Sequence, residues 1–263
     1  MYQDDFSKLE TMNIHSDVIF ANQADRNDYR EIQFEGHTAR MITTATRGVG
    51  KNRNIALLAA DREICLLADD DVTYTDGLEQ KIVGEFDRYP DADMILFNCA
   101  STDPVRKQTE HKKNSRCSRF SRMPYPTFRI AFRLSSVRKA NIWFTTLFGG
   151  GSVFPSGEDS MFLRDARRSG LRMYRSAVSI GTVDFSTSSW FTGHNEKYYY
   201  GRGAFSEAMH PRTSLLWNLY IAVRTAKHSG ISFSKRMRWC RYGRAGYRAM
   251  LSYDAFVKQL EGK

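Results

Sequence analysis

Three adjacent carboxylates, Asp69, Asp70 and Asp71, stand directly after the apolar run at residues 64–68. Like charges this close repel one another unless a proton or a cation compensates them. Carboxylate oxygens in small number suit Mg²⁺ or Mn²⁺, which keep open positions for water and for substrate phosphates. The triplet therefore predicts a metal site at a strand end, and a solvated acidic turn that caps the next helix is the alternative.

Two other segments could complete a reaction centre. A glycine turn precedes a helix-compatible segment at residues 48–58. Its backbone N–H groups, together with Lys51 and Arg53, could contact a diphosphate. Glu158 and Asp159 begin another amphipathic helix, where one carboxylate could accept a proton from an attacking hydroxyl. Taken singly, the first segment is as readily a plain turn, and the second is as readily helix N-terminal charge.

The apolar pattern predicts the elements that would position these residues. Short apolar runs closed by polar residues predict buried strands at residues 17–25, 39–43, 64–68 and 93–100. Helix-compatible segments lie between them, so the alternation indicates an α/β sheet. Residues 101–127 are rich in Ser, Pro, Lys and Arg, and we expect them to form a mobile basic excursion.

Composition limits the classes of protein that remain. With 263 residues and 41% hydrophobic content, the chain can bury a substantial core. Its four cysteines are far apart, which predicts neither a disulfide framework nor a thiolate zinc site and favours a cytoplasmic protein. Neither an export signal nor a run of 18 apolar residues is found, so no membrane span is expected.

The formal charge of +10 is concentrated in two segments. Residues 105–139 hold 11 Lys or Arg against one Glu, and residues 212–263 hold 11 against two acids. Such surfaces attract phosphates of nucleotides, lipids or nucleic acids. We expect one domain at residues 1–211 and a basic helical extension at residues 212–263. The apolar stretch at residues 215–223 could lie at an anionic membrane surface, and the alternative is a helix packed on the domain with a solvated basic face.

Together, the motifs resemble the family 2 glycosyltransferases of bacterial polysaccharide synthesis, which have the GT-A fold. The resemblance runs from about residue 17 to residue 203. It rests on the order and spacing of GVGKNRNIAL, ICLLADDDV, SGEDSMFLRDARRSGLRMY and SSWFTGHNEKYYYGRG. It implies a Rossmann-type mixed sheet flanked by helices, and by the same comparison we expect the strand with which such chains usually begin to be missing here.

The resemblance also assigns roles on the donor side of the site. Asp25 would help to hold the nucleotide base, and Arg53 and Asn54 would lie close to the nucleotide. Asp69 and Asp71 match the family's DxD element, with Asp69 near the ribose and Asp71 on the Mg²⁺ or Mn²⁺ ion. We count Lys51 and Asp70 with the donor-binding residues, and Asp69 with the metal ligands.

On the acceptor side, Asp159 matches the acid of the family's ED motif and would be the catalytic base, with Glu158 orienting that base or supporting the acceptor. Trp190 and His194 could contact the acceptor; a packed core indole and a surface histidine are the alternatives.

The implied reaction is a metal-dependent, inverting transfer of a hexosyl group from a nucleotide sugar, with a UDP-sugar favoured. The acceptor would be a hydroxyl of a glycan or of a lipid-linked molecule in capsule, exopolysaccharide or lipopolysaccharide synthesis. We place the enzyme in the cytoplasm or peripherally on the inner face of the cell membrane. A basic nucleic-acid-binding protein and an inactive, truncated relative are the alternatives; the first leaves both acidic motifs unexplained, and nucleic acid is not an expected partner.

Overall fold

The computed structural model describes residues 2–103, 107–118, 121, 125–185 and 193–262. Its internal contacts divide the chain into two compact units. We call Met1–Arg47, Lys51–Phe144 and Asp159–Thr187 the sheet unit, and Gly48–Gly50, Thr145–Glu158 and Ser188–Lys263 the helical unit. The expected domain boundary at residue 212 stays a prediction, because contact density does not show which part folds independently.

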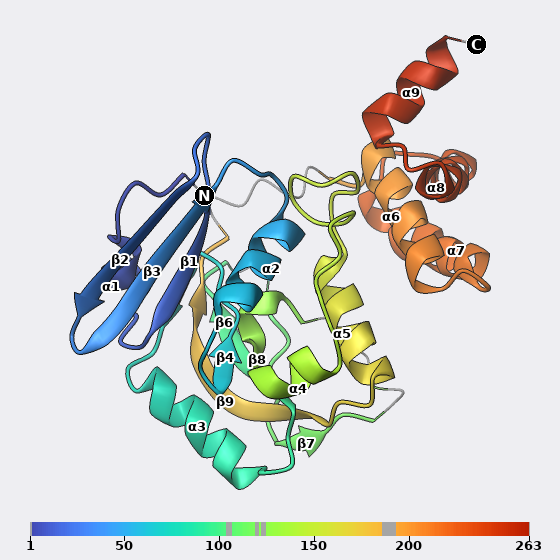
Figure 1. Cartoon of the computed structure of the whole chain (residues 1–263). Coiled ribbons are helices and arrows are strands. Elements are labelled where there is room, and N and C mark those ends of the chain that lie inside the picture. Colours follow the sequence, from blue (N-terminus) through green and yellow to red (C-terminus); the bar gives the residue numbers. More distant parts are fainter. Residues whose placement is uncertain (1, 104–106, 119–120, 122–124, 186–192, 263) are drawn as a thin grey trace. The chain divides into compact units, whose positions relative to one another are not determined.

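The first elements along the chain are α1 (Lys8–Thr11), β1 (Val18–Gln23), β2 (Asp28–Phe34), β3 (His37–Thr44), α2 (Val49–Ala59), β4 (Ile64–Leu66), β5 (Val72–Tyr74), α3 (Leu78–Arg88) and β6 (Met94–Ser101) (Figure 1). They are followed by β7 (Ser115–Arg116), the 3₁₀ turn η1 (Thr127–Arg129), β8 (Ile130–Arg133), α4 (Leu134–Lys139), α5 (Glu158–Arg168) and β9 (Met173–Val183). The expected strands at residues 17–25, 39–43, 64–68 and 93–100 are thus confirmed as β1, β3, β4 and β6.

Within the described residues, the strands form two sheets. In the first, β1 runs parallel and β2 antiparallel to β3. The second is mixed, with the order β4-β8-β6-β9-β5 and β7 paired to β9. In this sheet β6 and β9 are parallel, whereas the other paired strands are antiparallel. The expected absence of the strand with which family members usually begin stays a prediction.

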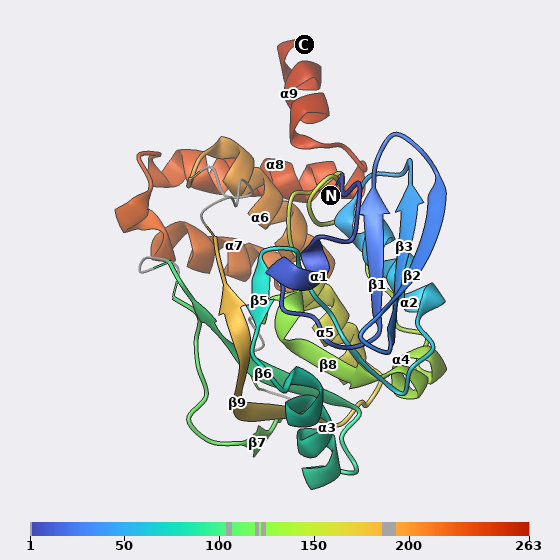
Figure 2. The same cartoon turned by 90° about the vertical axis from the view of Figure 1, so that its left-hand side faces the viewer.

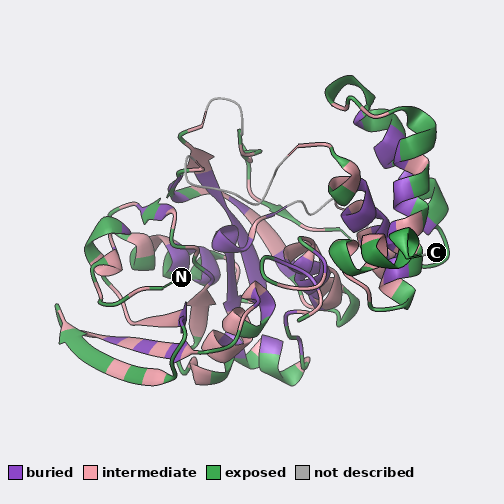
Figure 3. Cartoon of the chain, turned by 90° about the horizontal axis from the view of Figure 1, so that it is seen from above, coloured by how far each residue is buried: buried purple, intermediate pink, exposed green. Residues whose placement is uncertain are grey.

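Side chains alternate between the two faces of the mixed sheet, and both faces are buried. On β6, Met94 and Leu96 join one hydrophobic cluster, and Ile95 and Phe97 join the other. The first cluster includes residues of α2, α4 and α5, and the second includes residues of α3 and of the segment after α1. Figure 3 shows the buried residues gathered along the central strands. Helices therefore cover both faces of the sheet, which is the layered α/β arrangement that the sequence predicted.

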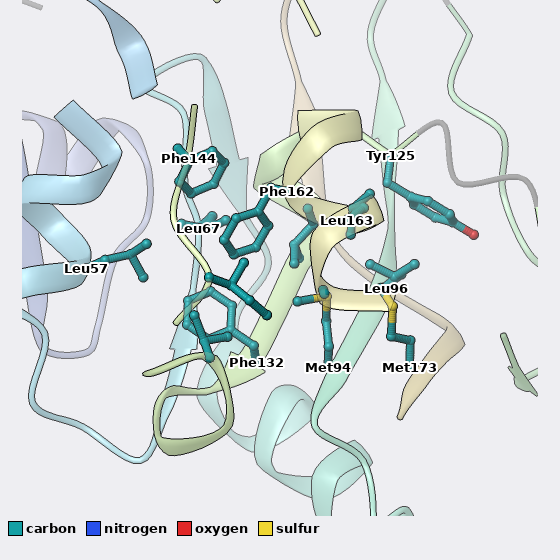
Figure 4. Close-up of a cluster of buried hydrophobic side chains, with 14 of the residues drawn as sticks. Leu57, Leu67, Met94, Leu96, Tyr125, Phe132, Phe144, Phe162, Leu163 and Met173 are labelled. Atoms are coloured by element: carbon teal, nitrogen blue, oxygen red, sulfur yellow. The ribbon is translucent and has the colours of Figure 1, made fainter. Parts of the chain in front are cut away.

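Aromatic stacking fixes α5 against the segment that follows α4. The rings of Phe144 and Phe162 are nearly parallel, with centroids 4.2 Å apart (Figure 4). Such pairs add about 0.5–1.5 kcal/mol to the burial of their area. Phe162 is fully buried, so the first turn of α5, which carries Asp159, is held in place.

The described part of residues 101–127 is tied to the mixed sheet by polar contacts. Asn98 on β6 donates to the carbonyl oxygen of His111 over 2.9 Å and accepts from its backbone N–H over 2.8 Å. Arg129, which is buried, donates to the carbonyl oxygens of Phe97 and Thr109. Apolar periodicity cannot reveal this kind of anchor, and the expected mobility of the segment stays a prediction.

The helical unit contains α6 (Glu196–Met209), α7 (Ser214–Arg224), η2 (Ala226–His228), α8 (Phe233–Arg248) and α9 (Tyr253–Glu261). Figures 1 and 2 show α6, α7 and α8 side by side. Glycines allow α6 and α8 to approach closely: a Cβ atom on Gly243 would lie 1.9 Å from the carbonyl oxygen of Tyr200. The helices expected after residue 214 are therefore present, but whether they form a separate basic extension stays a prediction.

Candidate active site

The three adjacent carboxylates lie in the turn between β4 and β5, inside the sheet unit. The backbone N–H of Leu67 donates to the carbonyl oxygen of Ile130 over 3.0 Å, which continues the pairing of β4 with β8 for one more residue. The chain then turns, and Val72 donates to the carbonyl oxygen of Asp69 over 3.3 Å. Strand β5 follows at once and pairs with β9. The turn therefore holds Asp69, Asp70 and Asp71 at the strand end where the sequence placed them.

Arg53 on α2 joins two of the predicted site residues. Its Nη2 donates to Oδ1 of Asp69 over 2.9 Å, and its Nη1 donates to Oδ1 of Asp159 over 3.0 Å. The Arg53 side chain is 12% exposed, whereas Asp69 and Asp159 are 33% and 27% exposed. Charge-assisted bonds to a forked guanidinium are strong and directional. Arg53 therefore fixes the distance between the acidic turn and the first turn of α5, while both carboxylates remain accessible to a ligand.

Backbone contacts hold Arg53 in this position. The next residue, Asn54, donates to the carbonyl oxygen of Phe144 and accepts from its backbone N–H, both over 2.9 Å. The guanidinium of Arg53 lies 5.4 Å from the centre of the Phe144 ring. The side-chain amide of Asn54 is thus already used within the protein, and its expected role near the nucleotide stays a prediction.

Asp71 carries the least compensated carboxylate of the turn. Its Oδ1 is buried, and no hydrogen-bond partner for it occurs among the described residues. Burial raises the pKa of Asp71 to about 6, and the charges of Asp69, Asp70 and Asp184 add to the rise. A buried carboxylate oxygen without a donor, surrounded by other carboxylates, fits a bound cation.

No group of three or more His, Cys, Asp or Glu side chains in the described part of the chain is arranged to hold a metal ion. Mg²⁺ and similar ions usually take only one or two carboxylates and complete their coordination with water and substrate phosphates. The residues present therefore fit a divalent cation that arrives with a phosphate ligand.

Glu158 packs inside the helical unit, although the next residue belongs to the sheet unit. Its Oε2 accepts from the backbone N–H of Gly157 over 3.1 Å. A Cβ atom on Gly149, whose φ is +108°, would lie 2.9 Å from the carboxyl carbon of Glu158. The glycine-rich loop thus makes room for this side chain. The expected role of Glu158 in supporting the acceptor or the base stays a prediction.

Asp25, which follows β1, forms an ion pair with Arg47 and is otherwise largely exposed. Arg47 also donates to the carbonyl oxygen of Ala24 and to the hydroxyl of Tyr2, over 2.8 and 2.7 Å. The sequence analysis missed Arg47, although it directly precedes the glycine turn that drew attention to Lys51. Lys51 is exposed on α2.

Thr127 is a second residue that the sequence analysis missed. Its hydroxyl donates to Oδ2 of Asp69 over 3.4 Å, from a fully buried position in η1. Asp70 uses its backbone carbonyl to accept from Lys8 over 2.9 Å. No local pattern marks Thr127 or Lys8, because both reach the turn from distant parts of the chain.

Of the two expected acceptor residues, Trp190 lies outside the described residues. His194 belongs to the helical unit, where its ring packs edge-on against Tyr198 at 4.8 Å and lies 6.0 Å from His228. Partial burial and the charge of His228 lower the pKa of His194. A role of either residue in acceptor binding stays a prediction.

Comparison with solved structures identifies the fold. The structure of residues 1–349 of S. aureus TarS in complex with UDP-GlcNAc gives a TM-score of 0.54 at 16% sequence identity, covering 83% of this chain and 77% of that one. The structure of TarS 1–349 without a named ligand gives a TM-score of 0.52 at 17% sequence identity, covering 82% of this chain and 76% of that one. The complex of TarS 1–349 with UDP gives a TM-score of 0.53 at 16% sequence identity, covering 82% of this chain and 76% of that one. The expected GT-A-like α/β fold is therefore confirmed, and at such identities the likeness concerns the fold alone.

Comparison of sequences identifies the family. No curated protein matches the chain. The model of glycosyl transferase family 2 matches residues 12–147, which is more than half of the 263 residues and includes the glycine turn, Arg53 and the acidic turn. The chain therefore belongs to glycosyl transferase family 2.

Proposed function

We propose that this protein transfers a sugar from a nucleoside diphosphate sugar, with a UDP-sugar favoured, to a hydroxyl group of a glycan or of a lipid-linked acceptor. The observation that carries the proposal is the double contact of Arg53, which joins Asp69 of the acidic turn to Asp159 of α5. A donor site and a base must stand side by side for such a transfer. TarS, which shares the fold, has been crystallised with UDP-GlcNAc and with UDP, and this supports a UDP-sugar as donor.

Asp159 is the base in this proposal. Its carboxylate is partly exposed, and one of its oxygens is held by Arg53. It would accept the proton of the acceptor hydroxyl as that oxygen attacks the anomeric carbon, which inverts the configuration in one displacement. Because Arg53 fixes the carboxylate, the proton acceptor is preorganised before the acceptor binds.

Asp71, with Asp69, would hold a Mg²⁺ or Mn²⁺ ion, which supplies positive charge beside the departing nucleoside diphosphate. The buried, unpartnered Oδ1 of Asp71 supports this assignment. Asp69 has an additional task, because Arg53 and Thr127 both donate to it. These contacts orient its carboxylate and leave Asp71 as the group most in need of a cation.

The acceptor and pathway are inferred from charge and from the resemblance. Basic residues are abundant in residues 105–139 and 212–263, and such surfaces favour phosphate-bearing or acidic ligands. A hexosyl transfer in the synthesis of a capsule, an exopolysaccharide or a lipopolysaccharide accommodates both the basic segments and the acidic turn.

Calorimetric titration of UDP with and without Mn²⁺ tests the donor site. We expect Mn²⁺ to raise the affinity at least about tenfold, equivalent to about 1.4 kcal/mol. Asp71→Asn should lose this gain, whereas Asp159→Asn should keep it and lower the rate of sugar transfer by about 100- to 10,000-fold. Asp61→Asn is the matched control, because Asp61 is an exposed carboxylate that pairs with Arg40 away from the acidic turn.

Two results would contradict the proposal. One is a folded wild-type protein that binds UDP neither with nor without Mn²⁺. The other is an Asp159→Asn variant that transfers sugar as fast as the wild type from the UDP-sugar that the wild type accepts.

A further inference from the structure

Helix α7 exposes a row of large apolar side chains. Leu216 and Val223 are 66% and 59% exposed, and four further apolar residues of the same helix are more than 40% exposed. These four are Leu215, Trp217, Leu219 and Tyr220. A helix on the surface of a soluble protein normally turns polar residues outward, so an outward face as apolar as this one marks an interaction site.

The opposite face of α7 is packed within the helical unit. At one end, the hydroxyl of Ser214 donates to Glu207 of α6 over 2.6 Å. Just past the other end, the hydroxyl of Thr225 lies 2.7 Å from that of Tyr199, also on α6. Ile221 and other residues between these two contacts are buried. The two polar contacts fix which side of α7 faces inward, so the row around Leu216 and Val223 faces outward.

Basic side chains stand at both ends of this apolar row. Arg212 precedes α7, and Arg224 and Lys227 follow its last apolar residue; all three are exposed. Arg224 donates to the hydroxyl of Tyr220 over 2.6 Å, and its guanidinium lies 5.8 Å from the centre of the Tyr220 ring, so its positive charge lies beside a residue of the apolar row. Over residues 212–263 the chain holds 11 Lys or Arg against two acids.

This charge selects the occupant of the apolar face. A second copy of the chain would bring the same excess of positive charge to the contact, which disfavours a dimer through this face. An anionic lipid surface supplies apolar acyl chains for the exposed row and negative headgroups for the flanking basic residues. Trp217, whose ring stacks on His210 at 4.8 Å, is of the type that settles at headgroup level.

We propose that α7 docks the protein on an anionic membrane by lying in the plane of the interface, with the row around Leu216 and Val223 inserted between the headgroups. The helix has 11 residues, about half the length of a membrane-spanning helix. In the part of the chain that the structure describes, we find no helix with the length and apolar character that crossing a bilayer requires. Docking concerns the helical unit, and it does not depend on the proposed sugar transfer.

Flotation of the full chain with vesicles tests this inference. Vesicles of phosphatidylcholine with about 30% phosphatidylglycerol should bind the wild type, and pure phosphatidylcholine vesicles should bind it at least about tenfold less. Raising NaCl from about 0.1 M to about 1 M should weaken binding, because the screening length falls from about 10 Å to about 3 Å. Leu216→Asp should weaken binding about tenfold or more.

Leu58→Asp is the matched control, since Leu58 is a leucine of equal exposure, 67%, on α2 of the sheet unit. It should bind vesicles like the wild type. Equal unfolding midpoints and equal UDP titrations of the two variants would show that the substitutions leave the rest of the protein intact. These titrations also report on the donor site separately, so a failure of docking is not confused with a failure of the proposed function.

Three outcomes would overturn the inference. One is the absence of wild-type binding to anionic vesicles at about 0.1 M salt, where the screening length is still about 10 Å. Another is equal binding of the wild type and Leu216→Asp. The third is a wild-type dimer that Leu216→Asp dissociates, which would assign the face to a second copy of the chain.

Discussion

Glu207 should be the main electrostatic support of the helical unit, and Glu207→Gln tests this. Its carboxylate, on α6, accepts from Arg244 over 2.8 Å, from two nitrogens of Arg248 over 2.9 and 2.6 Å, and from Ser214 over 2.6 Å. One buried carboxylate therefore ties α6 to both α7 and α8. The substitution keeps the shape of the side chain and removes its charge.

The pKa of Glu207 sets the expected magnitude. Burial alone would raise this pKa, but the hydrogen bonds from Ser214, Arg244 and Arg248 outweigh it and lower the value from 4.5 to about 2. At about 1.4 kcal/mol per pKa unit, the difference corresponds to about 3 kcal/mol of stability near neutral pH. Arg248 is largely exposed, so solvent screening reduces its share, and we expect Glu207→Gln to lose about 2–3 kcal/mol.

Urea unfolding followed by tryptophan fluorescence measures this loss, because Trp217 on α7 and Trp239 on α8 report on the affected unit. Glu196→Gln is the matched control on the same helix. Glu196 pairs with Lys235, whose side chain is half exposed, and such surface pairs contribute about 0–1 kcal/mol.

The pH dependence gives an independent check with a defined sign. A carboxyl whose pKa is lower in the folded state stabilises the protein above its unfolded pKa, and this contribution is lost as pH falls through the folded pKa. The stability difference between the wild type and Glu207→Gln should therefore be full above about pH 5 and shrink between about pH 5 and pH 2. A variant within about 0.5 kcal/mol of the wild type at pH 7, or a difference that does not change down to pH 3, would refute this reasoning.

Three further predictions concern the site and the packing. Arg53→Met should slow sugar transfer by about 30-fold or more, because two charge-assisted bonds of about 1.5–3 kcal/mol each are lost, whereas Arg53→Lys should be milder because the charge is kept; steady-state rates compare the two variants. Gly243→Ala should lose about 3 kcal/mol in urea unfolding, since its new Cβ would lie 1.9 Å from a backbone oxygen of α6, and Gly230→Ala, with open space around it, should be near neutral. Asn54→Ala should lose about 1–3 kcal/mol in the same assay, because it leaves both backbone groups of Phe144 without their partner.

The fold could be predicted from the sequence wherever burial leaves a local pattern. Strand β6 begins with four apolar residues in succession because both its faces are covered, and the apolar residues near the start of α5 are buried. On α3 an apolar residue is a less reliable sign of burial, since Ile82 and Phe86 are buried but the adjacent Val83 is 38% exposed. Strand β2 was missed, since none of its residues is buried and charged residues stand between its apolar ones.

Arg53 shows why the arrangement of the site is harder to predict than its residues. The acidic turn was evident because three carboxylates directly after an apolar strand are unusual in any surrounding. The residue that pairs with Asp69 and Asp159 is not marked in the same way, since Arg53 lies 16 positions before Asp69 and 106 before Asp159 in the chain. Its alignment with both carboxylates depends on the packing of α2 against the segment at Phe144, which is set by the paired hydrogen bonds of Asn54.

Asp69 and Asp71 differ in how their negative charges are compensated. Asp69 can remain charged beside its neighbours because a guanidinium and a hydroxyl both donate to it. Asp71 is two residues further along the same turn, and Arg53 is already shared between two other carboxylates. Its buried Oδ1 has no hydrogen-bond donor among the described residues. This condition supports the proposed cation and phosphate site over a purely structural turn, because a turn that served only folding would be more stable with Asn at this position.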